Sequence, residues 1–182
     1  SGTLSLTFNQ LNADPDMPFS QAYQLASERQ LTTANPESQE DLSGLDTAKK
    51  SLILARELGL SLELSDVQVH SLLPETVEGN LMEVLREKVD GPMAERFRAA
   101  KEKGELLFYV GRIDVQTGSV VAEIQSFPAK NPPFALHDAD MAVEVVSQRF
   151  PESTPLVFRG PGAGADFAAS GLFASLLRVC RS

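Results

Sequence analysis

The chain has 182 residues, of which 42% are hydrophobic and 23% are charged, and its formal net charge is −9. This composition is that of an ordinary globular domain, and the negative charge argues against nucleic acid or an anionic membrane as a partner, since both are bound mainly through Lys and Arg. A single cysteine and the lack of an apolar run of about 18 residues predict a reducing, cytoplasmic location without a transmembrane segment.

The first 60 residues predict two helices on either side of a polar loop. Apolar residues recur at helical spacing over 19–29 and over 43–59, with Ser20 and Ser43 as N-caps and Gly59 as a stop. The stretch LTTANPESQED between them has no period and predicts an exposed loop of the kind that often binds ligands. The chain opens on an apolar-periodic stretch without an initiator Met, from which we expect a domain cut from a longer polypeptide.

The remainder predicts strands and helices in a mixed order. Helices before and after a mostly antiparallel run of strands indicate an α+β fold, with a sheet covered by helices. In chain order the predicted elements are a strand over 62–74, helices over 76–89 and 91–104, a hairpin from 105–114 and 119–127, strands over 141–150 and 154–160, and a helix over 165–179.

The stretch LVFRGPGAGADF near the C-terminus matches the sequence motif of a dinucleotide-binding turn. Gly160, Gly162 and Ala165 form G-x-G-x-x-A between a predicted strand and a predicted helix. A complete strand-helix-strand unit needs roughly 30 residues and an acidic residue about 20 positions on, and the sequence ends before either is possible. Two interpretations stay open, a tight connection that needs close packing and a set of backbone N–H groups that face an anion or cofactor.

The sharpest polar pattern is EDLSGLDTAKK. Asp46 and Lys50 are four residues apart on the predicted helix and therefore share one face, and Asp41 lies in the loop just before it. One interpretation is an exposed ion pair beside a solvated acid. The other is a substrate clamp, in which the lysine donates a proton to a developing alkoxide and the carboxylate orients it.

The remaining candidates for chemistry are isolated. His70 and His137 have no neighbouring Cys or His to complete a metal site or triad, so both are interpreted as structural or surface residues. Cys180 is interpreted as a small core residue, and the run MAERFRAAKEKGE as a solvated helix face.

Five stretches resemble homoserine dehydrogenase, and most closely the dehydrogenase half of the bifunctional aspartokinase/homoserine dehydrogenases. They are SGTLS, EDLSGLDTAKKSLILARELG, LPETVEGN, RFRAAKEKGELLFYVGRID and PLVFRGPGAGADFAASGLFASLL. The resemblance covers nearly the whole chain, and its D-L-S-G-L-D-x-A-[RK]-K and R-G-x-G-A-G blocks are specific to that family.

The resemblance implies an oxidoreductase that interconverts L-aspartate 4-semialdehyde and L-homoserine with NAD or NADP, in threonine and methionine biosynthesis. Lys50 then corresponds to the catalytic lysine, and Asp46 and Asp41 to substrate-binding acids. Gly164, with Gly162, corresponds to the backbone that lines the nicotinamide. The physical logic agrees, because hydride attack on an aldehyde places negative charge on an oxygen that a nearby ammonium group stabilises.

Three departures from the family pattern stand out. Asn35 occupies the position of the glutamate expected to hold the substrate amine, and Leu6 occupies that of an aromatic residue. The nucleotide-binding Rossmann domain, with a further lysine and most of the monovalent-cation site, is expected upstream of this chain, so no metal site is predicted within it.

The sequence as a whole is therefore expected to be the catalytic and dimerisation domain of a homoserine dehydrogenase. We divide it into a helical substrate-site segment over 1–60, a sheet-forming part over 61–158, and a glycine turn with a return helix over 159–182. We expect a homodimer that is inactive as an isolated fragment. The alternative is a non-catalytic dimerisation or regulatory module of the same family. The return helix predicts apolar surface along Phe167, Leu172 and Leu176, exposed or covered by another copy.

Overall fold

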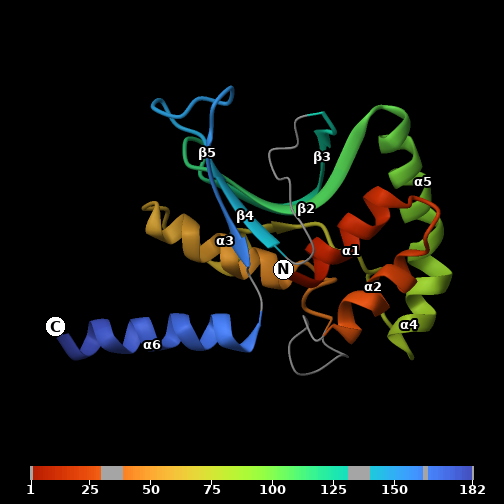
Figure 1. Cartoon of the computed structure of the whole chain (residues 1–182), viewed down its shortest axis with the longest axis horizontal. Coiled ribbons are helices and arrows are strands. Elements are labelled where there is room, and N and C mark those ends of the chain that lie inside the picture. Colours follow the sequence, from red (N-terminus) through yellow and green to blue (C-terminus); the bar gives the residue numbers. More distant parts are fainter. Residues whose placement is uncertain (1, 30–38, 131–139, 162–163, 182) are drawn as a thin grey trace.

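A long β-hairpin forms the centre of the fold (Figure 1). The computed structural model describes residues 2–29, 39–130, 140–161 and 164–181. Strands β2 (Glu105–Asp114) and β3 (Ser119–Pro128) pair antiparallel along their whole length. The Asp114 carboxylate accepts hydrogen bonds from two backbone N–H groups of the connecting turn, and Gly118 supplies the positive φ that the turn needs. The predicted hairpin is therefore confirmed.

The described helices, and the strands outside the hairpin, are short to medium in length. Their bounds are α1 Gly2–Ala13, α2 Phe19–Glu28, α3 Leu45–Glu57, the 3₁₀-helix η1 Leu64–Asp66, β1 Gln68–Val69, α4 Leu81–Val84, the π-helix η2 Leu85–Val89, α5 Asp90–Glu102, β4 Asp140–Val145, β5 Leu156–Pro161 and α6 Ala165–Arg181. In the described part of the chain no helix is long and apolar enough to cross a bilayer.

Helices pack against the two ends of the hairpin and create two apolar clusters. Helix α3 lies at the turn end, where Ala48, Leu52 and Ala55 contact Val120 and Ala122. Helices α1, α2 and α5 lie at the open end and form the larger cluster (Figure 1). Its buried side chains include Leu4, Phe8, Leu11, Phe19, Leu85 and Phe97. This mixed arrangement of helices and small antiparallel sheets is the α+β fold that the sequence predicts.

Helix α1 is fastened to the hairpin by one amide side chain. The Asn12 Nδ2 donates to the Leu107 carbonyl at 2.8 Å, and the Leu107 N–H donates back to Asn12 Oδ1 at 3.0 Å. Helix α2 begins after Pro18 rather than at Ser20, which corrects the predicted cap. The Ser20 N–H and hydroxyl instead donate to the Asp90 carboxylate at the start of α5, so the acid that stabilises this helix start comes from elsewhere in the chain.

Two predictions about the middle of the chain were wrong. The strand expected over 62–74 is a 3₁₀ turn followed by the two-residue β1, which pairs parallel with β3. The two helices expected on either side of residue 90 form one continuous run, α4–η2–α5, in which Met93, Phe97 and Ala100 are buried rather than solvated. The π-turn just before Pro92 explains the continuity, because the wider turn accommodates a residue without an N–H.

The C-terminal part of the described chain makes few contacts with the rest. Strands β4 and β5 pair antiparallel, and β4 is linked to α1 by a hydrogen bond from the Ser5 hydroxyl to the Asp140 carbonyl. Helix α6 buries none of its residues and lies apart from the other elements (Figure 1). Its large apolar side chains, Phe167, Leu172, Phe173, Leu176, Leu177 and Val179, are all exposed, as the sequence predicts. Cys180 is also exposed, so its interpretation as a core residue was wrong.

Candidate functional site

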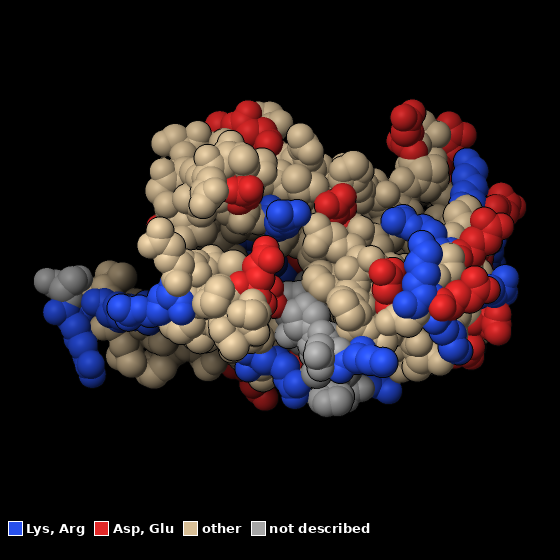
Figure 2. Space-filling view, turned by 90° about the horizontal axis from the view of Figure 1, so that it is seen from above, with Lys and Arg blue, Asp and Glu red and all other residues tan. Residues whose placement is uncertain are grey.

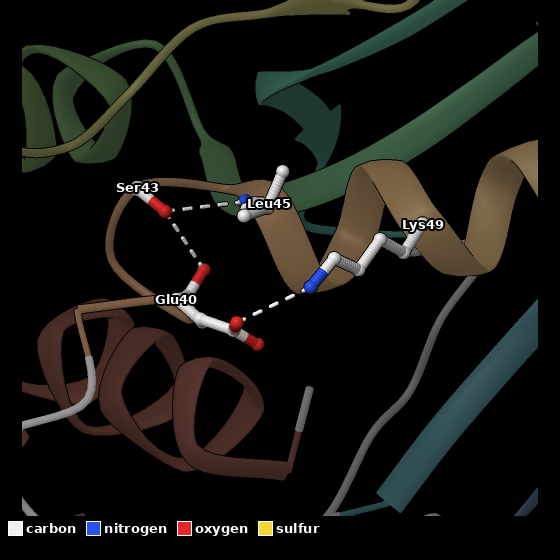
Figure 3. Close-up of polar contacts among 4 residues, drawn as sticks. All are labelled: Glu40, Ser43, Leu45 and Lys49. Atoms are coloured by element: carbon white, nitrogen blue, oxygen red, sulfur yellow. Dashed lines mark hydrogen bonds and ion pairs between the residues drawn. The ribbon is translucent and has the colours of Figure 1, made fainter. Parts of the chain in front are cut away.

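The turn over residues 39–44 places the predicted site residues at the start of α3. Its backbone closes on itself, with the Ser43 N–H donating to the Gln39 carbonyl at 2.7 Å and the Gly44 N–H to the Asp41 carbonyl at 3.1 Å. Gly44, at φ 79°, is the N-cap residue, in place of the predicted Ser43. The Ser43 hydroxyl still serves the turn, because it donates to the Glu40 carbonyl at 3.1 Å and accepts from the Leu45 N–H at 3.4 Å (Figure 3).

Tyr109 of β2 packs against the turn over residues 39–44. Its hydroxyl oxygen lies 3.0 Å from the His70 carbonyl oxygen and 3.3 Å from the Ala122 carbonyl oxygen, and both carbonyls accept a hydrogen bond from it. A Cβ atom built on Gly44 would collide with this hydroxyl, so the backbone of the turn rests directly on the tyrosine. Burial, and then the charge of Glu123, raise the pKa of Tyr109 to about 12. The tyrosine is therefore neutral at physiological pH and stays a hydrogen-bond donor.

Asp46 and Lys50 are brought together on the first two turns of α3. The Lys50 Nζ lies 2.7 Å from Asp46 Oδ2, and the two side chains are 47% and 27% exposed. An exposed i,i+4 pair of this kind contributes about 0.3 to 0.5 kcal/mol to folding, which gives it little structural value. The Lys50 ammonium group is accessible from solvent and is held in place by the Asp46 carboxylate, as a proton donor to a bound substrate requires.

The neighbouring Lys49 has a different environment. Its Nζ pairs with Glu40 Oε1 at 3.2 Å, on the side of the turn that Figure 3 shows, and both side chains are about half exposed. Two adjacent lysines therefore have separate acidic partners, Glu40 for Lys49 and Asp46 for Lys50. This difference supplies a matched control for any experiment on Lys50.

Asp41 is half-buried in the same turn, beside α2. Burial raises the pKa of Tyr23, and the charge of Asp41 raises it further, which places this carboxylate within electrostatic reach of the tyrosine. A backbone hydrogen bond connects this turn to α3, because the Asp46 N–H donates to the Glu40 carbonyl at 3.3 Å. Glu40 directly precedes Asp41 in the sequence. The role of Asp41 as a substrate ligand stays a prediction.

The other predicted site residues are less informative. Asn35, Gly162 and His137 lie outside the described residues. Gly164 is exposed at φ 119° immediately before α6, and no atom lies within 4 Å of the position of a built Cβ. In the described ranges no group of three or more His, Cys, Asp or Glu side chains could hold a metal ion.

Two supporting residues were missed by the sequence reasoning. Tyr109 and Gly111 lie in the predicted strand FYVGRID without a pattern that links them to the loop before α3. A Cβ on Gly111 would collide with the Ser51 hydroxyl and crowd Thr47, so the strand approaches α3 closely there. A glycine within a strand is the one available signal, because it often marks such an approach.

Comparison with known proteins identifies the family of this chain. The sequence model of the family described as homoserine dehydrogenase matches residues 1–177. The bifunctional aspartokinase/homoserine dehydrogenase 2 of Arabidopsis thaliana, a chloroplastic protein, is 38% identical over 183 residues, which cover 98% of this chain and 19% of that protein. The chain belongs to the homoserine dehydrogenase family.

Solved structures agree with the fold. A Candida auris protein of unknown function is similar over the whole of this chain, with a TM-score of 0.86 and 30% identity, and the match covers 51% of that protein. The homoserine dehydrogenase of S. aureus has a TM-score of 0.75 at 20% identity, over 99% of this chain and 41% of that protein. The chain thus spans about a fifth of the Arabidopsis relative, about half of the Candida auris protein and about two fifths of the S. aureus enzyme.

Proposed function

We propose that this chain is the catalytic and dimerisation region of an NAD(P)-dependent homoserine dehydrogenase, and that Lys50 is its proton donor. The observation that carries the proposal is the Lys50–Asp46 pair, 2.7 Å long and open to solvent, on a helix whose first turn is held by Tyr109. A structural ion pair does not need such a support. Membership of the homoserine dehydrogenase family supplies the substrate class, aspartate 4-semialdehyde and homoserine.

The chemistry of this site follows from the charge that develops during reduction. A nicotinamide, when bound, supplies a hydride to the aldehyde carbon of aspartate semialdehyde. As the carbonyl oxygen becomes negative, Lys50 Nζ donates a proton to it, and the product is the hydroxyl of homoserine. Asp46 positions the Lys50 side chain through their ion pair and accepts a hydrogen bond from the substrate, while Asp41 contributes a second carboxylate for substrate binding.

We propose that the described part of this chain contacts the nicotinamide end of the cofactor. The open space beside Gly164 would let a flat ring approach its backbone. By contrast, β5 pairs antiparallel with β4, so the glycine sequence after it does not form the parallel strand-helix-strand unit that binds a pyrophosphate. We propose that the rest of the cofactor is bound outside this chain, and that the chain by itself does not turn over.

Asn35 favours a second function. An amide in place of the expected glutamate removes a full charge from the predicted site for the substrate amine. If that loss is decisive, the chain is a non-catalytic dimerisation or regulatory module that keeps the family fold. Retention of Asp41, Asp46 and Lys50 supports the enzymatic function instead.

The test is a comparison of two proteins in one assay. NADPH oxidation with aspartate semialdehyde is measured for this chain alone and for a longer polypeptide in which the proposed nucleotide-binding domain precedes it. The proposal expects turnover by the longer polypeptide and none by the chain alone. Absence of turnover by the longer polypeptide with either NADPH or NADH, when it is folded and binds the dinucleotide, would support the non-catalytic function.

A further inference from the structure

A cleft of about 330 Å³, whose lining does not include Asp46 or Lys50, lies beside β3 between residues 70–74 and the η2–α5 helix. The volume has room for on the order of ten water-sized groups, which suits a small organic molecule. The floor of the cleft is apolar and buried, with Leu72, Val89 and Met93 each less than 10% exposed. Such a floor favours a ligand with a short hydrocarbon body.

Two cations line this cleft without partners of their own. Lys88 and Arg96 stand four residues before and four residues after Pro92, so all three share one face of the helix. Neither cation makes a hydrogen bond or ion pair with any part of the chain that the structure describes. Figure 2 shows charges of both signs crowded over α4 and α5, and Lys88 and Arg96 are the cations of this region that line the cleft.

The one acid in the cleft is already engaged. Glu123 accepts a hydrogen bond from Gln125 at 3.1 Å and lies 4.0 Å from the His70 imidazole. Lys88 and Arg96 together carry one more positive charge than Glu123 balances, which makes this lining locally positive in a chain whose formal net charge is −9. A single negative charge on the ligand balances this excess, whereas a doubly charged phosphate would exceed it beside Glu123.

We propose that this cleft binds a small monocarboxylate with a short aliphatic body, in a subsite separate from the Lys50–Asp46 site. Lys88 and Arg96 hold the carboxylate, and the apolar floor contacts the hydrocarbon. The proposal is independent of the proposed dehydrogenase activity, because it rests on the cleft alone.

The direct test is a titration of the isotopically labelled chain with sodium hexanoate, followed by the amide signals in NMR at constant ionic strength. Saturable shifts are expected at residues 70–74 and 88–96. Hexanamide, which lacks the charge, and acetate, which lacks the hydrocarbon, should each bind several-fold more weakly. Lys88→Gln and Arg96→Gln should each weaken hexanoate binding about three- to tenfold.

Lys101→Gln is the matched control, because Lys101 is an exposed lysine of the same α5 that does not line the cleft. This variant should bind hexanoate as the unmodified chain does. Both cleft cations are exposed, so the variants should keep the spectrum of the folded chain. The absence of saturable shifts, equal binding of hexanamide, an unchanged affinity in both cleft variants, or amide shifts confined to α6 would overturn the proposal.

Discussion

The hydroxyl of Tyr109 fills the space in which a side chain at Gly44 would begin. This contact joins the central hairpin to the turn that starts α3, and therefore to the helix that carries Asp46 and Lys50. The tyrosine is fixed in turn by the carbonyls of His70 and Ala122. A contact of this kind transmits the position of the hairpin to the candidate site without any direct contact with a substrate.

Gly44→Ala should therefore destabilise the chain by more than its backbone conformation alone explains. The positive φ costs about 1 to 2 kcal/mol for a residue with a Cβ, and the collision with Tyr109 should add about 1 to 3 kcal/mol. Gly59→Ala is the control, since Gly59 also has a positive φ but open space around it. The free energy of unfolding in urea measures both, and equal losses in the two variants would contradict the contact.

Tyr109→Phe should change the response to alkali. Because the pKa of Tyr109 is raised to about 12 in the folded chain and is near 10 in the unfolded chain, the stability it contributes is complete below pH 10 and is lost as pH rises toward 12. The phenylalanine variant should lose less stability between pH 10 and pH 12 than the unmodified chain does. At pH 7 it should be less stable than the unmodified chain. Denaturation curves at several pH values check this, and identical pH profiles for the two proteins would count against the assignment.

Charges placed on α6 should leave folding unchanged. Leu172→Glu combined with Leu176→Glu alters side chains that are 75% and 56% exposed on a helix without buried residues. The free energy of unfolding should shift by no more than about 0.5 kcal/mol, while binding of a hydrophobic dye and self-association should fall. A large loss of stability would show that α6 packs on the remainder of the chain.

Asn35→Glu tests how far the departure from the family pattern matters. In a longer polypeptide that also carries the proposed nucleotide-binding domain, a restored carboxylate should lower KM for aspartate semialdehyde about three- to tenfold, because hydrogen bonds to charged groups are stronger than neutral ones. Asn35→Gln controls for side-chain length. Steady-state kinetics with no gain in the glutamate variant would favour the non-catalytic module.

Much of the fold follows from local sequence patterns. The long hairpin, α3 and α6 were predicted because alternating or helical spacing in each is continuous and bounded by glycine or polar turns. The failures lie where tertiary contacts override local preference. Residues 62–74 alternate like a strand, yet only two of them pair, because β3 offers a parallel partner at just Val121 and Ala122.

In the candidate site, too, the local contacts were predicted and the tertiary contacts were not. The i,i+4 spacing was enough to predict that Asp46 and Lys50 meet, since it depends on one helix. Tyr109 lies 65 positions beyond Gly44, and nothing in either local sequence indicates that the two touch. The same holds for Asp90, which binds the start of α2 from 70 residues away. Such supports become visible only in three dimensions.

The most direct test of the central claim compares two adjacent lysines in a longer polypeptide that joins this chain to the proposed nucleotide-binding domain. Lys50→Ala should lower kcat for the reduction of aspartate semialdehyde by about 10²- to 10⁴-fold, the range expected for loss of a general acid. Lys49→Ala, which removes the partner of Glu40 on the same helix, should retain nearly full kcat. A Lys50→Ala variant as active as Lys49→Ala would contradict the assignment of Lys50 as the proton donor.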